Sequence, residues 1–355
     1  MSGLAAKKIA VRFDAVDALK NIDLEVPAGS FVTLLGPSGC GKTTLLNVIS
    51  GFLKPTDGRV YIDGIDVTDT PPERRDTALC FQSYALFPHL SVEENLVFGL
   101  RQRGMSGADR AKRLRDVVGQ LDLGDHLSKL PNQLSGGQQQ RVSLGRALTV
   151  RPSVILFDEP LSNLDAKLRE TVRHEIRSIQ QDFGLTAVYV THDQNEALAM
   201  SDKIFVLNKG QLEQAGTPQD LYHAPRTRFV ADFVGSANVM QARVVSRAQV
   251  DVWQVVTPLG PLMVRSDTPP EADNVLIAWR AEAVIMGHDP VNAVTAKVVR
   301  RSFEGAYTDL FFDVEGKTFR VQQTETNLVA GEDMTFSILP DNIVFLSDSV
   351  SKVAS

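Results

Sequence analysis

Residues 36–43 read GPSGCGKT and match the pattern G-x-x-x-x-G-K-[ST] at every position. Glycines have no Cβ, so the backbone can curl around a phosphate and aim several N–H groups at it. Lys42 is expected to reach the β- and γ-phosphates of a nucleotide, and the Thr43 hydroxyl is expected to coordinate Mg²⁺. The pattern predicts an ATP site lined by Gly36, Pro37, Ser38, Gly39, Cys40, Gly41, Lys42, Thr43 and Thr44.

An acidic pair follows a second apolar segment. Residues 154–157, VILF, predict a buried strand that ends in Asp158 and Glu159. A carboxylate at the end of a buried strand is costly unless it meets a cation, so Asp158 is expected to be a second contact for Mg²⁺. Glu159 is expected to orient and deprotonate a water in line with the γ-phosphate. The alternative is that the pair caps the next helix; the phosphate loop upstream favours the catalytic interpretation.

The elements that position these residues follow a strand–helix rhythm up to about residue 235. Residues 44–50 predict a helix directly after the phosphate loop, and Gly51 is expected to close it. The alternation predicts an α/β fold with a mainly parallel sheet covered by helices. The predicted strands cover residues 31–35, 154–157, 186–190 and 203–207. A further helix carries its apolar stripe at Leu168, Val172, Ile176 and Ile179.

Two regions depart from this rhythm. Residues 91–149 are mostly helical in pattern, so we expect a helical subdomain at about 88–150 within an α/β domain of residues 1–235. After residue 235, short apolar runs bounded by turn residues predict strands, including a hairpin about Glu315 and Gly316. The sequence thus predicts a P-loop NTPase core followed by an all-β, barrel-like domain at residues 236–355. A regulatory or dimerising role is expected for that second domain.

Composition narrows the class of protein. The chain has 355 residues and a formal net charge of −6 without a run of basic residues, which argues against nucleic acid as the main partner. No apolar stretch is long enough for a signal peptide or a membrane span. Its two cysteines make no disulfide framework and fit a reducing compartment. Within the phosphate loop, Cys40 is either a redox-sensitive brake or, as we favour, a small residue that fits the turn.

Further short motifs stand in a fixed order around the phosphate loop and the acidic pair. Residues 134–141 read LSGGQQQR, Gln82 lies in CFQSY, Asp165 ends SNLD, and His192 lies in THD. Over about the first 235 residues, the ordered set resembles the ATP-binding-cassette (ABC) ATPases. In that family these motifs are the signature sequence, the glutamine loop, the D-loop and the switch histidine. Phe13 lies upstream, where the family places an aromatic residue that stacks on adenine.

The resemblance implies a site made by two copies of the chain. They would pair head to tail, with each ATP between the phosphate loop of one copy and the signature of the other. Ser135 can cap a helix whose N–H groups face the γ-phosphate. The implied catalytic residues are Glu159, His192, Lys42 and Gln82, with the relative weight of Glu159 and His192 left open. The implied Mg²⁺ ligands are Thr43, Gln82 and Asp158. The other implied nucleotide contacts are Phe13, Ser135, Gly136, Gly137, Gln138 and Asp165.

Two segments resemble importer subunits in particular. Residues 84–95, YALFPHLSVEEN, are similar to the segment by which importer ATPases hold a short helix of a permease. Exposed Tyr84, Leu86 and Phe87 would form an apolar groove for it, with an ordinary core turn as the alternative. The β-rich tail resembles the small oligonucleotide-fold domain of importer ATPases for sugars, polyamines, iron and oxyanions.

An importer subunit of this type implies specific partners and a place in the cell. It would work with a second copy, two membrane permease subunits and, indirectly, an extracytoplasmic solute-binding protein, at the cytoplasmic face of the inner membrane. A polyamine such as spermidine or putrescine is the favoured cargo, and iron(III), phosphonate or sugar importers are the alternatives. A soluble ABC ATPase of DNA repair or translation is the alternative from another class; a single cassette without sustained heptads argues against it.

Overall fold

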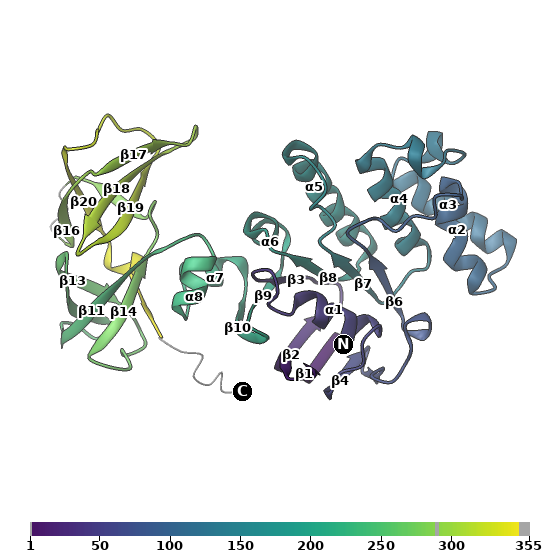
Figure 1. Cartoon of the computed structure of the whole chain (residues 1–355), viewed down its shortest axis with the longest axis horizontal. Coiled ribbons are helices and arrows are strands. Elements are labelled where there is room, and N and C mark those ends of the chain that lie inside the picture. Colours follow the sequence, from purple (N-terminus) through teal and green to yellow (C-terminus); the bar gives the residue numbers. More distant parts are fainter. Residues whose placement is uncertain (1, 288–290, 348–355) are drawn as a thin grey trace. The chain divides into compact units, whose positions relative to one another are not determined.

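The computed structural model describes residues 2–287 and 291–347, and it divides into two compact units, Met1–Pro218 and Gln219–Ser355 (Figure 1). The sequence predicted a boundary at about residue 235, but the two units divide after Pro218. The short helices between residues 218 and 235 pack within the second unit. None of the helices in the described ranges is long and apolar enough to cross a membrane.

A six-stranded sheet forms the centre of the first unit, in the order β10-β9-β3-β8-β7-β6. Its strands are β3 (Phe31–Leu35), β6 (Thr77–Cys80), β7 (Val154–Asp158), β8 (Thr186–Thr191), β9 (Lys203–Asn208) and β10 (Gln211–Gly216). β3 runs parallel to β8 and β9, and β7 runs parallel to β6 and β8, whereas β10 runs antiparallel to β9. The expected α/β fold with a mainly parallel sheet is confirmed. The carboxyl ends of parallel strands share one edge, so Gly36, Asp158 and His192 come to the same side.

A second, antiparallel sheet in this unit was not among the predicted elements. It has the order β2-β1-β4-β5 and consists of β1 (Ser2–Phe13), β2 (Val16–Pro27), β4 (Asp57–Ile62) and β5 (Ile65–Asp66). Its side chains share one core with helix α1 (Lys42–Ser50) and with one face of the central sheet. Register shifts interrupt the pairing of β1 with β2 at four places, which breaks the period-two pattern by which a strand is recognised in sequence.

Helices cover the opposite face of the central sheet. Phe31, Phe157 and Tyr189 pack there with ring centroids 5.6–6.5 Å apart, and the helices close over them. The helical insertion expected between the strands is confirmed, since three of these helices lie between β6 and β7 (Figure 1). The helices are α2 (Val92–Gln102), α3 (Gly107–Gln120), α4 (Gly136–Thr149), α5 (Ala166–Phe183) and α6 (Gln194–Met200).

The second unit is mainly β-structure, as expected. It contains sheets of order β13-β12-β11-β14-β21, β15-β20-β16 and β17-β18-β19 around one core that includes Trp279, Phe312 and Phe336. Glu315 and Gly316 have φ of 50° and 77° and form the predicted hairpin turn. The strands are β11 (Asn238–Arg247), β12 (Val252–Thr257), β13 (Gly260–Arg265), β14 (Asn274–Trp279), β15 (Val284–Met286), β16 (Ala293–Lys297), β17 (Arg300–Phe303), β18 (Thr308–Val314), β19 (Lys317–Gln323), β20 (Asp333–Ile338) and β21 (Val344–Leu346).

Two short helices, α7 (Pro218–His223) and α8 (Arg228–Phe233), complete the second unit. Arg280 follows β14 and is 6% exposed. Its guanidinium donates to the carbonyl oxygens of Tyr222 and Ala231 and stacks over the Tyr222 ring at 4.2 Å. These bonds use the carbonyl groups at the ends of both helices, so the helices are fastened to the β-core.

Candidate functional site

The phosphate loop connects β3 to α1. Lys42 is only 5% exposed, and its Nζ donates hydrogen bonds to the carbonyl oxygens of Gly36 at 2.7 Å and Pro37 at 3.0 Å. The ammonium group therefore lies inside the curl of its own loop. Gly41, at the N-cap of α1, has a φ of 106° and gives the helix no side-chain cap, so the first N–H groups of α1 are left for a ligand.

Close packing explains the small residues in this loop. A Cβ on Gly36 would collide with the carbonyl oxygen of Leu207, and a Cβ on Gly41 would lie 2.9 Å from the carbonyl oxygen of Ala18. Cys40 is buried, and burial raises the pKa of its thiol although Lys42 lies nearby. A protonated, buried thiol favours the interpretation of Cys40 as a small residue that fits the turn.

Thr43 and Asp158 meet where α1 begins and β7 ends. The Thr43 hydroxyl donates to Asp158 Oδ1 across 3.4 Å. Burial raises the pKa of the Asp158 carboxyl, and the neighbouring Glu159 adds to this rise. A hydroxyl and a desolvated carboxylate are oxygen ligands of the kind that Mg²⁺ prefers, and a cation would stabilise the charged form of Asp158. This pair fits the expected magnesium site.

Glu159 and His192 form a second close pair at the same edge. His192 Nδ1 lies 3.1 Å from Glu159 Oε2. Glu159 has a φ of 44°, and its N–H donates to the Val190 carbonyl of β8, which fixes the turn after β7. The Ser162 hydroxyl donates to the Glu159 carbonyl at 2.9 Å. An outlying φ held by surrounding bonds is common at functional sites because it aims a side chain.

The signature segment forms the start of α4. Ser135 is its N-cap: the Ser135 hydroxyl accepts from Gln138 N–H at 3.4 Å, and the Gln138 side chain accepts from Ser135 N–H at 2.9 Å. Ser135 is exposed, Gly136 is half-buried, and Gly137 is buried. Within the described ranges, no hydrogen bond or ion pair joins residues 135–138 to the phosphate loop.

Two further predicted nucleotide contacts lie on separate elements. Asp165 is exposed and caps α5 by accepting from Leu168 N–H at 2.9 Å. Phe13 ends β1, and its side chain is 49% exposed. An exposed aromatic ring is available for stacking on a base, but the structure joins neither Phe13 nor Asp165 to Lys42 by a bond between described residues.

The glutamine loop lies between β6 and α2. Gln82 is exposed, and its carbonyl oxygen accepts from the Asn163 side chain at 3.0 Å. Tyr84 and Ala85 both have positive φ, and Arg146 of α4 donates to both of their carbonyl oxygens. Bonds from Asn163 and Arg146 therefore hold the loop at Gln82 and at the strained turn of residues 84–85.

The side chains expected to form an exposed groove are half-buried instead, which corrects the prediction for Tyr84, Leu86 and Phe87. The Phe87 ring packs against Phe98 with centroids 4.4 Å apart. The buried Asn95 side chain bonds both the N–H and the carbonyl of Phe87, which draws the segment down onto α2.

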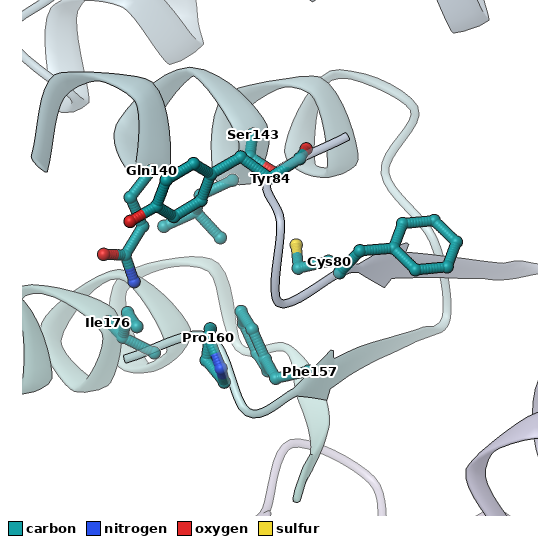
Figure 2. Close-up of a pocket in the computed structure, with 9 residues that line it drawn as sticks. Cys80, Tyr84, Gln140, Ser143, Phe157, Pro160 and Ile176 are labelled. Atoms are coloured by element: carbon teal, nitrogen blue, oxygen red, sulfur yellow. The ribbon is translucent and has the colours of Figure 1, made fainter. Parts of the chain in front are cut away.

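A small cavity lies beneath Tyr84 (Figure 2). Its volume is about 10 Å³, close to the minimum that one water needs. Burial raises the pKa of the Cys80 thiol on its wall to about 12, so this cysteine is not a nucleophile. The Gln140 amide beside it is buried and has no hydrogen-bond partner among the described residues. The cavity is a packing gap next to the glutamine loop.

Sequence reasoning missed the charged residues behind His192. Arg169 of α5 lies 3.6 Å from Asp193 and 3.9 Å from Glu196, and Glu196 is buried. These residues come from two helices, and spacing along one helix does not show that they meet. A Glu four residues after His192 was the available signal, since a buried acidic residue so close to a switch histidine needs a partner.

Comparisons with known proteins agree with this geometry. Residues 19–162 match the family model described as ABC transporter. The chain is 40% identical to the Fe(3+) ions import ATP-binding protein FbpC of Photorhabdus laumondii, over 97% of each chain. It is 46% identical to the spermidine/putrescine import ATP-binding protein PotA of Thermobifida fusca, over 79% of this chain and 73% of that one.

Solved structures with this fold include an ATP-binding cassette dimer, MJ0796, in a post-hydrolysis state with ADP and Pi. It is 36% identical, covers 61% of this chain and 98% of its own, and superposes with a TM-score of 0.53. Full-length likeness to importer subunits, together with the phosphate loop, the acidic pair and the capped signature helix, leads to one assignment. The chain belongs to the ABC transporter family, as the ATP-hydrolysing subunit of an importer.

Proposed function

We propose that the residues at the carboxyl edge of the central sheet hydrolyse ATP. The observation that supports this most is the 3.1 Å contact between His192 Nδ1 and Glu159 Oε2, beside Asp158 and the phosphate loop. Glu159 accepts a proton from the attacking water as that water bonds to the γ-phosphorus, and the bond to the bridging oxygen of ADP breaks. His192 contacts the Glu159 carboxylate through Nδ1, and it either stabilises the transition state or holds the γ-phosphate.

The phosphate loop binds and orients the nucleotide. Lys42 exchanges its bonds to the loop carbonyls for bonds to the β- and γ-phosphates, and the uncapped N–H groups of α1 complete the anion site. Thr43 and Asp158 would hold Mg²⁺, with Gln82 as a third ligand. When bound, the ion supplies positive charge that stabilises the charge on the phosphates. Phe13 stacks on the adenine ring.

A complete site requires two copies in head-to-tail arrangement. Ser135 is exposed at the start of α4 and is not bonded to its own phosphate loop. A second copy would bring this helix end, with Gly136, Gly137 and Gln138, to the γ-phosphate of the first copy. Asp165 lies at the exposed N-cap of α5 and would take part in the same interface.

The subunit works beneath two permease subunits at the cytoplasmic face of the inner membrane. A solute-binding protein on the other side of the membrane delivers the cargo to them. The second unit regulates or dimerises the subunit. Pull-down of the tagged chain from gently solubilised membranes, with mass spectrometry of its partners, tests this. Recovery of two permease-type membrane proteins is expected, whereas ribosomal or DNA-repair proteins in their place would move the function to a soluble ABC ATPase.

Polyamine is the cargo that we propose, and iron(III) is the second candidate. The relative of highest identity among those given above is a spermidine/putrescine import subunit, but the relative matched along its full length is an Fe(3+) import subunit. Uptake of labelled spermidine and of labelled ferric iron, in cells with and without the gene, separates the two. Loss of spermidine uptake alone is expected; loss of iron uptake alone would favour the second candidate, and loss of neither would leave phosphonate or sugar.

A further inference from the structure

The side chain of His192 makes few contacts that would hold its ring in place. The side chain is 56% exposed, and its hydrogen bond within the described ranges is the 3.1 Å contact with Glu159. An exposed ring is kept in a productive position mainly by the residues that fix its backbone. The groups that hold Thr191 and Asp193 therefore decide where the imidazole lies.

A buried carboxylate fixes the segment on both sides of His192. Glu196 is 4% exposed, and its Oε2 accepts from the Thr191 hydroxyl at 2.7 Å and from the Tyr189 hydroxyl at 2.9 Å. The Thr191 oxygen in turn accepts from Asp193 N–H at 2.9 Å. Burial raises the pKa of the Glu196 carboxyl, because its charge lies where water solvates it poorly.

Arg169 is the cation beside this carboxylate. Its Nε lies 3.9 Å from Glu196 Oε1, and its Nη1 lies 3.6 Å from Asp193 Oδ2. Nε is buried without a hydrogen-bond partner in the described part of the chain, so it acts on Glu196 through charge. A buried carboxylate that loses its cation is strongly destabilised or takes up a proton.

The same guanidinium also holds the loop in front of α5. Arg169 Nη2 donates to the Leu164 carbonyl at 3.1 Å, and the adjacent Asn163 donates to the Gln82 carbonyl at 3.0 Å. A continuous set of contacts therefore runs from the glutamine loop through residues 163–164 to Arg169. From Arg169 it continues to Asp193 and Glu196, on either side of the turn that follows His192.

Arg169 borders an open space next to the Glu159–His192 pair. A hollow of about 60 Å³ lies between the Glu159–His192 pair, Arg169 and Glu196. One water needs only about 10–15 Å³, so the hollow has room for several waters. The Arg169 side chain therefore has unfilled space beside it, whereas Leu164 is 7% exposed and packs in the core beneath the helices.

We propose that Arg169 is a positioning residue that makes the place of His192 depend on the place of the loop at residues 163–164. The inference rests on the proposed catalytic role of His192. Arg169 makes no contact with the phosphate loop within the described residues, so its loss should slow hydrolysis without weakening ATP binding. A change that reaches Gln82 from a partner would pass through Asn163 and Leu164 to the catalytic pair.

The test compares Arg169→Gln with Arg177→Gln. Arg177 lies on the same helix and pairs with Asp202, at 3.1 Å from Oδ2. Within the described residues, no hydrogen bond or ion pair joins Arg177 to residues 191–196. Arg169→Gln is expected to lower kcat roughly tenfold, the size of a typical coupling between contacting groups, with KM for ATP and nucleotide affinity unchanged. Arg169→Lys should restore part of kcat, because it keeps the charge but loses the planar fork. Arg177→Gln should lower the melting temperature while kcat is kept.

A second pair of variants separates this inference from the role of His192. In a His192→Ala background, Arg169→Gln should lower kcat by less than about twofold, because the residue through which it acts is already gone. Independent, multiplying losses in the double variant would overturn the inference while leaving His192 catalytic. Unchanged kcat in Arg169→Gln would overturn it too. Full turnover in His192→Ala alone would overturn the role of His192 and this inference with it.

Discussion

Two helices in the first unit differ in whether a side chain caps the free N–H groups at their N-terminus. Helix α1 begins at Gly41 without a side-chain cap, and its Lys42 is buried in the phosphate loop. Helix α4 begins with a full capping box, in which Ser135 and Gln138 satisfy each other's N–H groups. The uncapped end is prepared for a strong anion ligand. The capped end is stable by itself and can offer only weaker contacts to a nucleotide held elsewhere.

Binding of ATP and completion of the ATP site therefore depend on different parts of one chain. The phosphate loop should bind ATP in a single copy, whereas the signature helix should matter only when a second copy is present. The proposed catalytic pair, Glu159 and His192, lies on the phosphate-loop side, since Glu159 follows Asp158 directly.

Glu159→Gln should abolish most turnover while ATP binding is retained. Loss of a positioned general base typically costs about 10²–10⁴-fold in rate. The measurements are steady-state phosphate release and equilibrium binding of a fluorescent ATP analogue. Glu170→Gln, at an exposed position of α5, is the matched control and should keep full turnover. Turnover near the wild-type rate in Glu159→Gln would remove Glu159 from the mechanism.

Lys42→Ala should weaken ATP binding itself, even at protein concentrations where no dimer forms. A hydrogen bond to a charged group contributes about 1.5–3 kcal/mol, which corresponds to roughly 10–150-fold in affinity. Titration calorimetry measures it, with the exposed Lys54→Ala variant as a control for charge. Wild-type affinity in Lys42→Ala would contradict the assignment of the phosphate loop.

A mixture of two inactive variants should regain activity. In a head-to-tail dimer, Lys42→Ala and Ser135→Arg subunits together form one site with an intact loop and an intact signature. Equal mixing gives half mixed dimers with one good site of two, or about a quarter of the wild-type sites. Steady-state turnover of the mixture measures this. A mixture no more active than its components would show that the phosphate loop and the signature helix of one site do not come from different copies.

Ser135→Ala should have the smallest effect on the isolated chain. Loss of an N-cap side chain costs about 1 kcal/mol of stability. Thermal unfolding should show a small decrease in melting temperature, and nucleotide affinity of the single copy should not change. A large fall in single-copy affinity would mean that the signature helix contacts ATP in its own chain.

Local structure could be predicted from the sequence where all the residues that determine it lie within one short segment. Residues 36–43 combine a loop, a glycine at the helix start and a buried lysine, and local spacing is enough to predict them. The capping role of Ser135 follows for the same reason. The structure has both, while the catalytic and binding roles of these residues stay predictions.

Features made by distant segments could not be predicted in this way. Shifts in register with β2 interrupt the period-two alternation of buried and exposed residues in strand β1. Phe87 was expected to be exposed, but the side chain of Asn95 draws its backbone inward. Arg169 and Glu196 meet only because α5 and α6 pack side by side. In each case the residue that determines the structure lies on another helix or strand, so the local sequence pattern could not predict the contact.

The mass of Glu159→Gln with and without ATP shows whether two copies of the chain share each ATP site. If ATP completes a site shared by two copies and cannot be hydrolysed, adding Mg²⁺ and ATP should raise the dimer fraction of the variant, as measured by light scattering after gel filtration. Adding Ser135→Arg to the same chain should abolish this rise. A variant that binds ATP with no rise in its dimer fraction would show that two copies do not share the site.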